Sequence, residues 1–363
     1  LHKAIRRQRQ MCIRDREMEA LKYLVSLVND VLDMNKLQSG DLKDQQLLFD
    51  LTIVLRELNQ IYDERAAKKG IRYEIDWKST YSHSALVGNP VYLGRILSNI
   101  LDNAIKFSQA GSVLTVWVKE EILDDGRAFF TFYCKDQGVG MSEDFIAHAF
   151  DMFSQESETS RSRYEGTGLG LAITKQLVDR MGGSIELKSK VGVGTTVIVK
   201  IPFKIGTQDK NSNLSDKPVC LDDYSVEGMR ALVVEDNELN MEISRCILED
   251  SGMEVTCAVD GQEAVEIFEK SAPDYFAVIY MDIMMPRMNG LDAARTIREM
   301  KRRDARRVPI IAMSANAFVE DIINSRLAGM NVHLAKPLDA EKMIVALKQC
   351  MADNSDVKLH EDL

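Results

Sequence analysis

The chain has 363 residues, of which 45% are apolar and 28% are charged, and its formal net charge is −10. This length suits two domains, and the composition is ordinary for a globular protein with buried cores. An acidic chain without interleaved basic and aromatic residues is not expected to bind nucleic acid.

The first 40 residues contain one helical pattern. Residues 1–16 are basic and patternless, and the string MCIRDR resembles translated sequencing-adaptor read-through, so we treat this segment as unreliable. Between residues 17 and 38, apolar residues recur every three or four positions, and Gly40 ends the pattern, which predicts a helix with one narrow apolar stripe. Such a stripe fits either a helix-bundle partner or burial against the neighbouring domain.

Helical and strand patterns alternate between residues 47 and 203. Helices are expected at residues 51–69, 90–107 and 169–181, and strands at 71–77, 113–120, 128–135, 184–189 and 195–202. Turn residues between neighbouring strands predict hairpins. Helices before and after such hairpins predict an α+β two-layer sandwich, with the helices packed on one face of a mixed sheet.

A polar segment and a second domain follow. Residues 204–228 have little apolar periodicity, so we expect a linker there. Residues 229–352 contain five short apolar runs, ALVV, MEVTCAV, YFAVIYM, VPIIAM and VHLA, each followed by an amphipathic stretch. These repeats predict an α/β doubly wound fold with a five-stranded parallel sheet, in which function gathers at the carboxyl edge. Residues 353–363 are expected to form a tail.

Three glycines lie at alternate positions in EGTGLGLAI, directly before a helical pattern. They are Gly166, Gly168 and Gly170. Glycine lets the backbone approach an anion closely, and a helix N-terminus favours negative charge, so this stretch predicts a phosphate-wrapping loop. A plain turn is the alternative if no other stretch agrees.

The helix expected at residues 90–107 carries Asn99, Asn103 and Lys106 on one face. Amide oxygens and an ammonium group suit magnesium and phosphate, although such residues also occur on solvated surfaces. These three polar residues precede a second pattern that suits nucleotide binding, which favours a role in binding over a solvated surface.

This second pattern is DQGVG, which follows a predicted strand. The carboxylate of Asp136 could accept a hydrogen bond from an exocyclic amine, while Gly138 and Gly140 would let a flat base approach the backbone. A turn with a helix-capping acid is the alternative for this segment taken alone.

Five motifs together carry a resemblance. NILDNAIKFS, DQGVG, FDMFSQ, EGTGLGLAI and SKVGVGTTVIVKIP occur in the order and spacing of the ATP-binding domain of sensor histidine kinases, within the GHKL ATPase group. The resemblance covers residues 47–203, and residues 17–40 resemble the second helix of that family's dimerisation hairpin. It implies ATP and Mg²⁺ as ligands and a homodimer.

The resemblance also implies residue roles. Asn103 would hold the magnesium ion, Asn99 and Lys106 would attend the phosphates, and Asp136 would read adenine. The three glycines of EGTGLGLAI would form the hinge of a mobile lid. Glu165 departs from the family because many relatives have another glycine there, which would change the stiffness or charge of the lid.

The family's phosphoacceptor histidine lies on the first hairpin helix, in a His, acid, apolar, Arg, Thr, Pro motif. The five histidines of this chain lie outside such a context: His2, His83, His148, His333 and His360. We therefore expect the acceptor on a histidine-bearing dimerisation helix, either upstream in the same protein or on another chain.

Acidic residues follow two of the strands predicted for the second domain. Glu235 and Asp236 follow ALVV, and Asp282 follows YFAVIYM, so their carboxylates should converge at one sheet edge. Clustered carboxylates repel one another unless a cation such as Mg²⁺ lies among them, and Asp282 could then attack a phosphoryl group. Ser314 and Lys336 end the next two strands and can contact phosphoryl oxygens. One such acid alone would be read as a helix cap.

VVEDNELN, MDIMMPRMNG, MSANA and AKP resemble the motifs of a response-regulator receiver domain, which has a flavodoxin-like fold. The resemblance implies that Asp282 is the phosphoacceptor. It further implies that Glu235 and Asp236 bind magnesium together with Asp282 and the carbonyl oxygen of Met284.

Three more roles follow from the receiver resemblance. Ser314 and Lys336 would sense the phosphoryl group. His333 occupies the position of the family's aromatic switch residue, and whether an imidazole performs that movement stays open.

The two resemblances predict part of a hybrid sensor histidine kinase. The γ-phosphoryl group of ATP would pass to a histidine, then to Asp282, and then to a downstream phosphotransfer protein or response regulator; alone, the chain should lack autophosphorylation. The rival hypothesis is a non-catalytic, ATP-binding scaffold whose receiver is phosphorylated in trans. A GHKL-type ATPase is disfavoured because Asn99 stands where such ATPases have a glutamate base.

Cysteine spacing and hydropathy indicate the compartment. The six cysteines form no CxxC pair, which argues against zinc motifs and a disulfide scaffold and indicates reduced thiols. No apolar run approaches the roughly 18 residues of a membrane helix. We therefore expect a cytoplasmic location, and an inner-membrane anchor in the full-length protein stays open.

Overall fold

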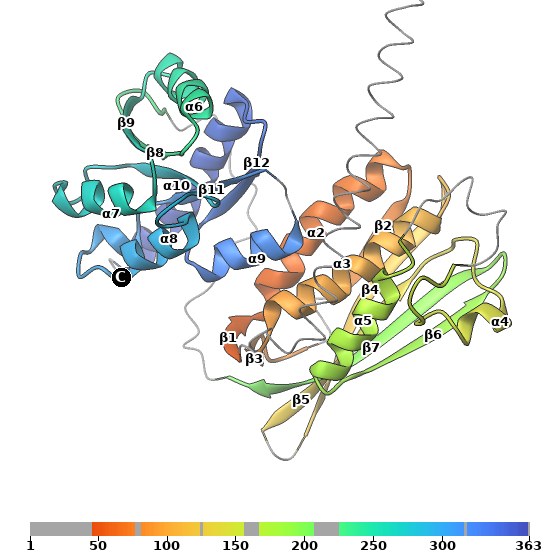
Figure 1. The fold of residues 1–363 in the computed structure, drawn as a ribbon. Helices are drawn as coiled ribbons and strands as arrows, with labels where there is room; N and C mark the ends of the chain where they lie inside the picture. The colour runs from red at the N-terminus through yellow and green to blue at the C-terminus, as the bar shows by residue number, and fades with distance from the viewer. Residues whose placement is uncertain are drawn as a thin grey trace, which may run out of the picture. The chain divides into compact units, whose positions relative to one another are not determined.

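The computed structural model describes residues 46–76, 81–123, 126–155, 167–206, 225–315 and 318–361. The chain forms two compact units, Leu1–Thr207 and Gln208–Leu363 (Figure 1). The helix predicted at residues 17–38 and the predicted loop residue Gly166 lie outside the described residues.

The first unit is the predicted α+β two-layer sandwich. Its seven-stranded sheet has the order β1-β3-β7-β5-β4-β2, and β6 pairs with β7. The strands are β1 (Leu47–Asp50), β2 (Arg72–Asp76), β3 (Ala85–Gly88), β4 (Val113–Ile122), β5 (Arg127–Lys135), β6 (Ser184–Lys190) and β7 (Gly194–Ile205). The sheet is mixed because β2 pairs with β4 in parallel, whereas β4 pairs with β5 in an antiparallel hairpin.

Helices α2 (Leu51–Lys68), α3 (Pro90–Phe107) and α5 (Gly170–Arg180) cover one face of this sheet (Figure 1). The residues of β5 alternate between buried and half-buried because only that face is covered. Helix α3 begins where Asn89 accepts a hydrogen bond from Tyr92 N at 3.0 Å and Pro90 occupies the first turn. The short helix α4 (Glu143–Ile146) follows the DQGVG loop.

Two neighbouring strands at one end of this sheet, β1 and β3, were not predicted. β1 and β3 have four residues each, which is too short for a clear alternating pattern. β7 is longer than predicted, because one end of it pairs with β3 through Leu86↔Ile205 and Val87↔Lys204. The linker expected at residues 204–228 therefore begins two residues too early, since Lys204 and Ile205 belong to β7.

The second unit contains the predicted five-stranded parallel sheet, with the order β12-β11-β10-β8-β9. Its strands are β8 (Arg230–Val234), β9 (Glu254–Ala258), β10 (Val278–Asp282), β11 (Ile310–Ser314) and β12 (Val332–Ala335). Its helices are α6 (Glu238–Asp250), α7 (Gly261–Lys270), α8 (Gly290–Glu299), α9 (Val319–Leu327) and α10 (Ala340–Glu361). A 3₁₀ turn spans Asp304–Arg306.

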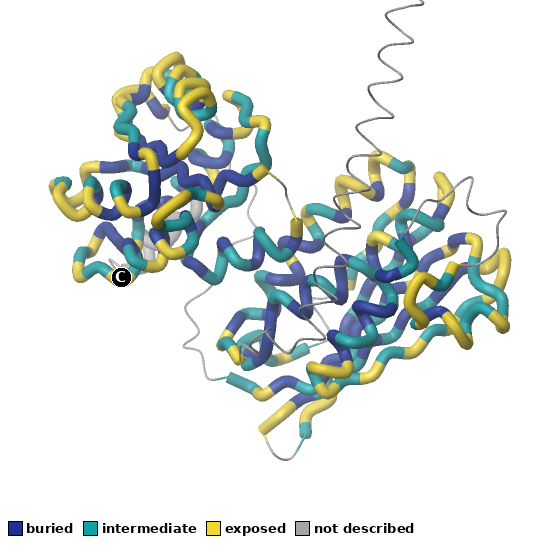
Figure 2. The backbone as a smooth tube through the Cα atoms, in the orientation of Figure 1, coloured by how far each residue is buried: buried dark blue, intermediate teal, exposed yellow. Residues whose placement is uncertain are grey.

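Helices cover both faces of this sheet, as a parallel sheet requires. α7 and α8 pack on one side through residues such as Phe268 and Ile297, and α6 and α10 pack on the other through Leu248 and Leu347. Every residue of β10 is buried, and Figure 2 shows the buried strands at the centre of the unit.

The carboxyl-terminal end of the chain differs from the prediction. Residues 353–361 were expected in a tail, but they continue α10 to Glu361. No helix in the described part of the chain is both long and apolar enough to cross a membrane.

Candidate functional site

The predicted nucleotide residues of α3 lie on its half-buried side. Asn99 Nδ2 donates to Gly170 O at 3.4 Å and to Thr174 Oγ1 at 3.3 Å. These bonds join the middle of α3 to the first turn of α5. Asn103 and Lys106 are also half-buried, and the Lys106 ammonium lies 5.0 Å from the ring centroid of Phe107.

Asp136 is the buried acid of this region, with 7% of its surface exposed. Its Oδ1 accepts hydrogen bonds from Gly138 N at 2.8 Å and from Thr195 N at 3.1 Å. Burial raises the pKa of this carboxyl group, and the two backbone donors oppose that shift. Among the described residues both bonds fall on Oδ1, so Oδ2 is the oxygen suited to an exocyclic amine.

The glycines of DQGVG have a structural reason that the sequence analysis did not foresee. A Cβ atom on Gly138 would lie 2.8 Å from Phe107 O, and one on Gly140 would overlap Lys190 O. Gly140 also has a φ of 70°. Close packing against protein backbone therefore requires glycine at both positions, whether or not a base lies nearby.

The glycines before α5 differ from one another. Gly168 has a φ of 69°, and a Cβ atom there would lie 2.8 Å from the carbonyl carbon of Phe153. Phe153 N also donates to Gly168 O at 3.0 Å, so the two backbones pack directly. Gly170 opens α5, and a Cβ atom there would meet no described atom within 4 Å.

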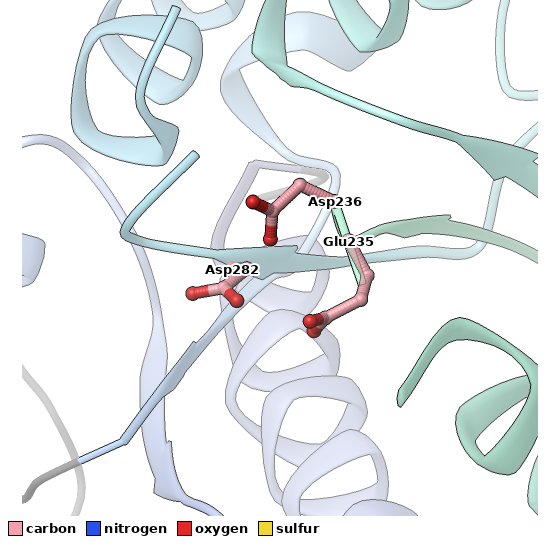
Figure 3. A group of neighbouring side chains, drawn as sticks. All are labelled: Glu235, Asp236 and Asp282. Atoms are coloured by element: carbon pink, nitrogen blue, oxygen red, sulfur yellow. The ribbon is translucent and has the colours of Figure 1, made fainter. Parts of the chain in front are cut away.

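The second unit brings three of its predicted acids together at the carboxyl edge of the sheet (Figure 3). Glu235, Asp236 and Asp282 each offer an oxygen, and these oxygens lie within 4.8 Å of one another. Glu235 and Asp282 are 1% and 5% exposed, whereas Asp236 is exposed. Three carboxylate oxygens at this spacing are a suitable donor set for Mg²⁺.

Lys336 compensates the buried charge of this cluster. Its Nζ donates to Glu235 Oε2 at 2.6 Å and to Asp282 Oδ2 at 2.5 Å. Burial lowers the pKa of Lys336, but Asp282 and Glu235 outweigh this effect and raise it overall. Burial raises the pKa of Glu235, against hydrogen bonds from Lys336 and Asn240.

Two further residues support the cluster and were missed by the sequence analysis. Asn240 Nδ2 donates to Glu235 Oε1 at 2.9 Å from the first turn of α6. A Cβ atom on Gly290 would overlap Asp282 O, and Gly290 N donates to Ile283 O at 2.9 Å. The motifs EDNELN and MNG contain these residues, but spacing alone did not indicate their partners.

Met284 follows Asp282 at the cluster. Its backbone N donates to Asp282 Oδ1 at 3.1 Å, and its side chain is 77% exposed. The backbone of Met284 therefore lies beside the phosphoacceptor candidate, where its carbonyl oxygen was expected to act.

Ser314 contacts the predicted switch residue. Its Oγ lies 2.8 Å from His333 Nε2, and His333 Nδ1 lies 3.3 Å from Ser325 Oγ on α9. Ser325 Oγ also donates to Ile322 O at 2.8 Å, so His333 links Ser314 to a serine that is anchored on the backbone of α9. Ser325 was missed because it lies on a different element.

Two family models match the chain. Residues 88–205 match the model "Histidine kinase-, DNA gyrase B-, and HSP90-like ATPase", and residues 231–348 match the "Response regulator receiver domain". The chain therefore contains an ATPase domain of this family followed by a response-regulator receiver domain. The first match contains α3, DQGVG and α5, and the second contains the cluster around Asp282.

Curated relatives match most of the chain. The sensory/regulatory protein RpfC of Xanthomonas campestris pv. campestris (strain ATCC 33913) is 31% identical over 347 residues, covering 90% of the chain and 47% of RpfC. The autoinducer 2 sensor kinase/phosphatase LuxQ of Vibrio parahaemolyticus is 30% identical, covering 87% of the chain and 36% of LuxQ. The aerobic respiration control sensor protein ArcB of Escherichia coli K12 is 30% identical, covering 90% and 40%.

The chain spans less than half the length of these relatives. The ATPase and receiver families imply ATP use and Mg²⁺ binding in general, and the histidine kinase family implies dimerisation and phosphotransfer partners.

Proposed function

We propose that this chain is the catalytic and receiver part of a phosphorelay kinase. The γ-phosphoryl group of ATP passes to a ring nitrogen of a histidine on a dimerisation helix, and ADP leaves. A carboxylate oxygen of Asp282 then attacks the phosphohistidine, so that the P–N bond breaks and an acyl phosphate forms. The observation that carries this proposal is the buried contact of Lys336 with Glu235 and Asp282, next to Asp236.

The residues around Asp282 have distinct tasks in this mechanism. Glu235, Asp236 and Asp282 would hold Mg²⁺, which would supply positive charge to the phosphoryl oxygens. Lys336 keeps two buried carboxylates close together and is placed to contact the phosphoryl group. Ser314 donates to the phosphoryl group once its hydroxyl leaves His333.

The ATPase domain, which we assign to residues 47–203, binds and orients the nucleotide. Asp136 accepts the hydrogen bond from the adenine amine, as its buried carboxylate and the two backbone donors on Oδ1 suggest. Asn103 holds the magnesium ion of the nucleotide, and Asn99 and Lys106 attend the phosphates. Catalysis in this step rests on positioning and charge neutralisation.

Base stability of the label tests this function, because a phosphohistidine survives base and an aspartyl phosphate is lost in it. With labelled acetyl phosphate and Mg²⁺, the chain should acquire a base-labile label on Asp282. With labelled ATP and Mg²⁺ alone, it should acquire almost none. A base-stable label from ATP would show that a histidine of this chain is the acceptor, and an unlabelled Asp282 would refute the receiver function.

A scaffold function without kinase activity is the second candidate. It is favoured because none of the five histidines of this sequence lies in the acceptor motif of the family: His2, His83, His148, His333 and His360. To separate the candidates, a histidine-bearing dimerisation hairpin is fused to the amino end. A kinase should then label the hairpin from ATP and pass the label to Asp282, whereas a scaffold should leave it unlabelled.

A further inference from the structure

The last turn of α3 is where the two halves of the nucleotide site meet. Lys106, at the phosphate end, lies in this turn. Phe107 O accepts a hydrogen bond from Val139 N at 3.3 Å, and Gly138 packs directly over the same carbonyl group. The DQGVG loop, at the adenine end, therefore rests on the backbone of the turn that carries Lys106.

Lys69, the C-cap residue that directly follows α2, contacts this turn. Its Nζ donates to Ile105 O at 2.6 Å and to Lys106 O at 2.7 Å. The carbonyl groups of a last helical turn have no partners within the helix, and a cation there also interacts favourably with the helix dipole. One ammonium group thus binds the backbone of Lys106 directly.

Lys69 is the last of a series of polar contacts between α2 and α3, which pack side by side (Figure 1). Tyr62 OH donates to Ser98 O at 3.1 Å, and Arg65 pairs with Asp102 at 2.7 Å. The partners on α3 come directly before Asn99 and Asn103 in the sequence. These contacts fix the rotation and the axial position of α3 relative to α2.

We infer that Lys69 is a positioning residue for nucleotide binding, an inference that rests on the proposed ATP binding. It lies outside residues 88–205, which match the ATPase family model. A nucleotide must meet Lys106 with its phosphates and Asp136 with its base at the same time. Lys69 holds the turn that sets the separation of these two ends, and a small change in that separation weakens any ligand that spans both.

A simple helix cap would have a different consequence. It would stabilise the domain without affecting the relative affinities of ligands that reach one end or both ends of the site. The comparison of adenosine, which reaches only the base end, with Mg-ADP, which spans the site, therefore separates positioning from stability.

The experiment measures the dissociation constants of Mg-ADP and adenosine for the full chain and its variants. Lys69→Met should weaken Mg-ADP binding roughly tenfold, as loss of a supporting contact typically does, and should change adenosine binding much less. Lys68→Met is the matched control, since Lys68 is exposed, pairs with Glu64 and carries the same charge one residue earlier. It should bind both ligands like the wild type. Lys69→Arg should restore Mg-ADP binding, because a guanidinium group can still donate to both carbonyls.

Several outcomes would overturn the inference. They are unchanged Mg-ADP binding in Lys69→Met, equal losses for adenosine and Mg-ADP, equal losses in Lys68→Met, or no rescue by arginine. If Lys69→Met does not fold, Lys69→Gln takes its place with the same expectations, because glutamine is uncharged and its side chain is shorter than that of lysine. A wild-type chain that binds neither ligand would instead refute the proposed ATP binding itself.

Discussion

The acidic cluster and the nucleotide site are built in different ways. Glu235, Asp282 and Lys336 come from the ends of strands in one parallel sheet and meet through short, charged contacts. The proposed nucleotide residues come from helices and loops, and contacts such as that of Asn99 with Gly170 are long and uncharged. The receiver pocket is thus already organised around its own charges, whereas the nucleotide site depends on how neighbouring backbones pack.

The largest effect should come from removing Asp282, the proposed phosphoacceptor. Asp282→Asn should reduce labelling by acetyl phosphate by more than about a hundredfold, because an amide is a poor nucleophile. Quantifying the base-labile label measures this effect. Asp250→Asn, at an exposed carboxylate of α6, is the matched control and should label normally. Normal labelling of Asp282→Asn would place the phosphoryl group elsewhere.

Removing the ammonium group of Lys336 tests whether it compensates the charges of Glu235 and Asp282. Lys336→Met should destabilise the receiver by about 2–3 kcal/mol without Mg²⁺, since two buried carboxylates lose their partner, and the figure is reduced for partial exposure. Mg²⁺ should recover more stability in this variant than in the wild type. Thermal unfolding with and without Mg²⁺ measures both effects.

The stability cost of Lys336→Met should depend on pH through the ionisation of Glu235. Its folded-state pKa is raised by burial, so between its ordinary pKa and the folded one the folded state holds a proton that the unfolded state has lost. Stability therefore falls as pH rises through that window, and the cost of Lys336→Met should shrink in acid. A cost that grows in acid would contradict the assignment of Lys336 as the partner of ionised carboxylates.

Asp136→Asn tests the proposed nucleotide site through ADP affinity and through the pH dependence of stability. The asparagine Oδ1 can still accept from Gly138 and Thr195, but its amide nitrogen cannot accept from adenine, so ADP affinity should fall roughly tenfold or more. Because burial raises the pKa of Asp136, the ionised acid costs stability as pH rises through that range, and the variant should lose this dependence. Calorimetric titration and unfolding at several pH values measure the two effects.

The exposed Asp179, which pairs with Lys175, provides the control for this substitution. Asp179→Asn should leave ADP affinity unchanged. If ADP affinity fell equally in Asp136→Asn and Asp179→Asn, the loss would come from the change in overall charge and not from the contact of Asp136 with adenine.

The smallest effect concerns the link between Ser314 and His333. His333→Phe removes the hydrogen bond between the imidazole and Ser314. Labelling of Asp282 by acetyl phosphate should then become about threefold faster, because the loss of one neutral hydrogen bond leaves the Ser314 hydroxyl available to the phosphoryl group. Ser325→Ala, which leaves the Ser314 contact intact, should have a smaller effect. Initial rates of labelling measure this, and slower labelling in His333→Phe would mean that the imidazole assists Ser314.

Some long-range contacts could not be predicted, for reasons that differ by region. The strands β1 and β3 are too short to show an alternating pattern, and the length of β7 is set by its pairing with β3. Glycines 138 and 140 were assigned to an approaching base, but the packing partners are Phe107 and Lys190, far away in the sequence. The contacts of Ser325 and Lys69 likewise join separate helices and strands.

The sequence by itself determined the two domains, their fold classes and the acids of the receiver pocket. It could do so because local periodicity defines helices and strands, and because parallel strands bring their carboxyl ends to one edge. Only the tertiary structure decided which groups compensate one another: Lys336 with Glu235 and Asp282, Ser314 with His333, and Lys69 with the end of α3. Such pairs depend on side-chain distances between elements far apart in the chain, which no local pattern encodes.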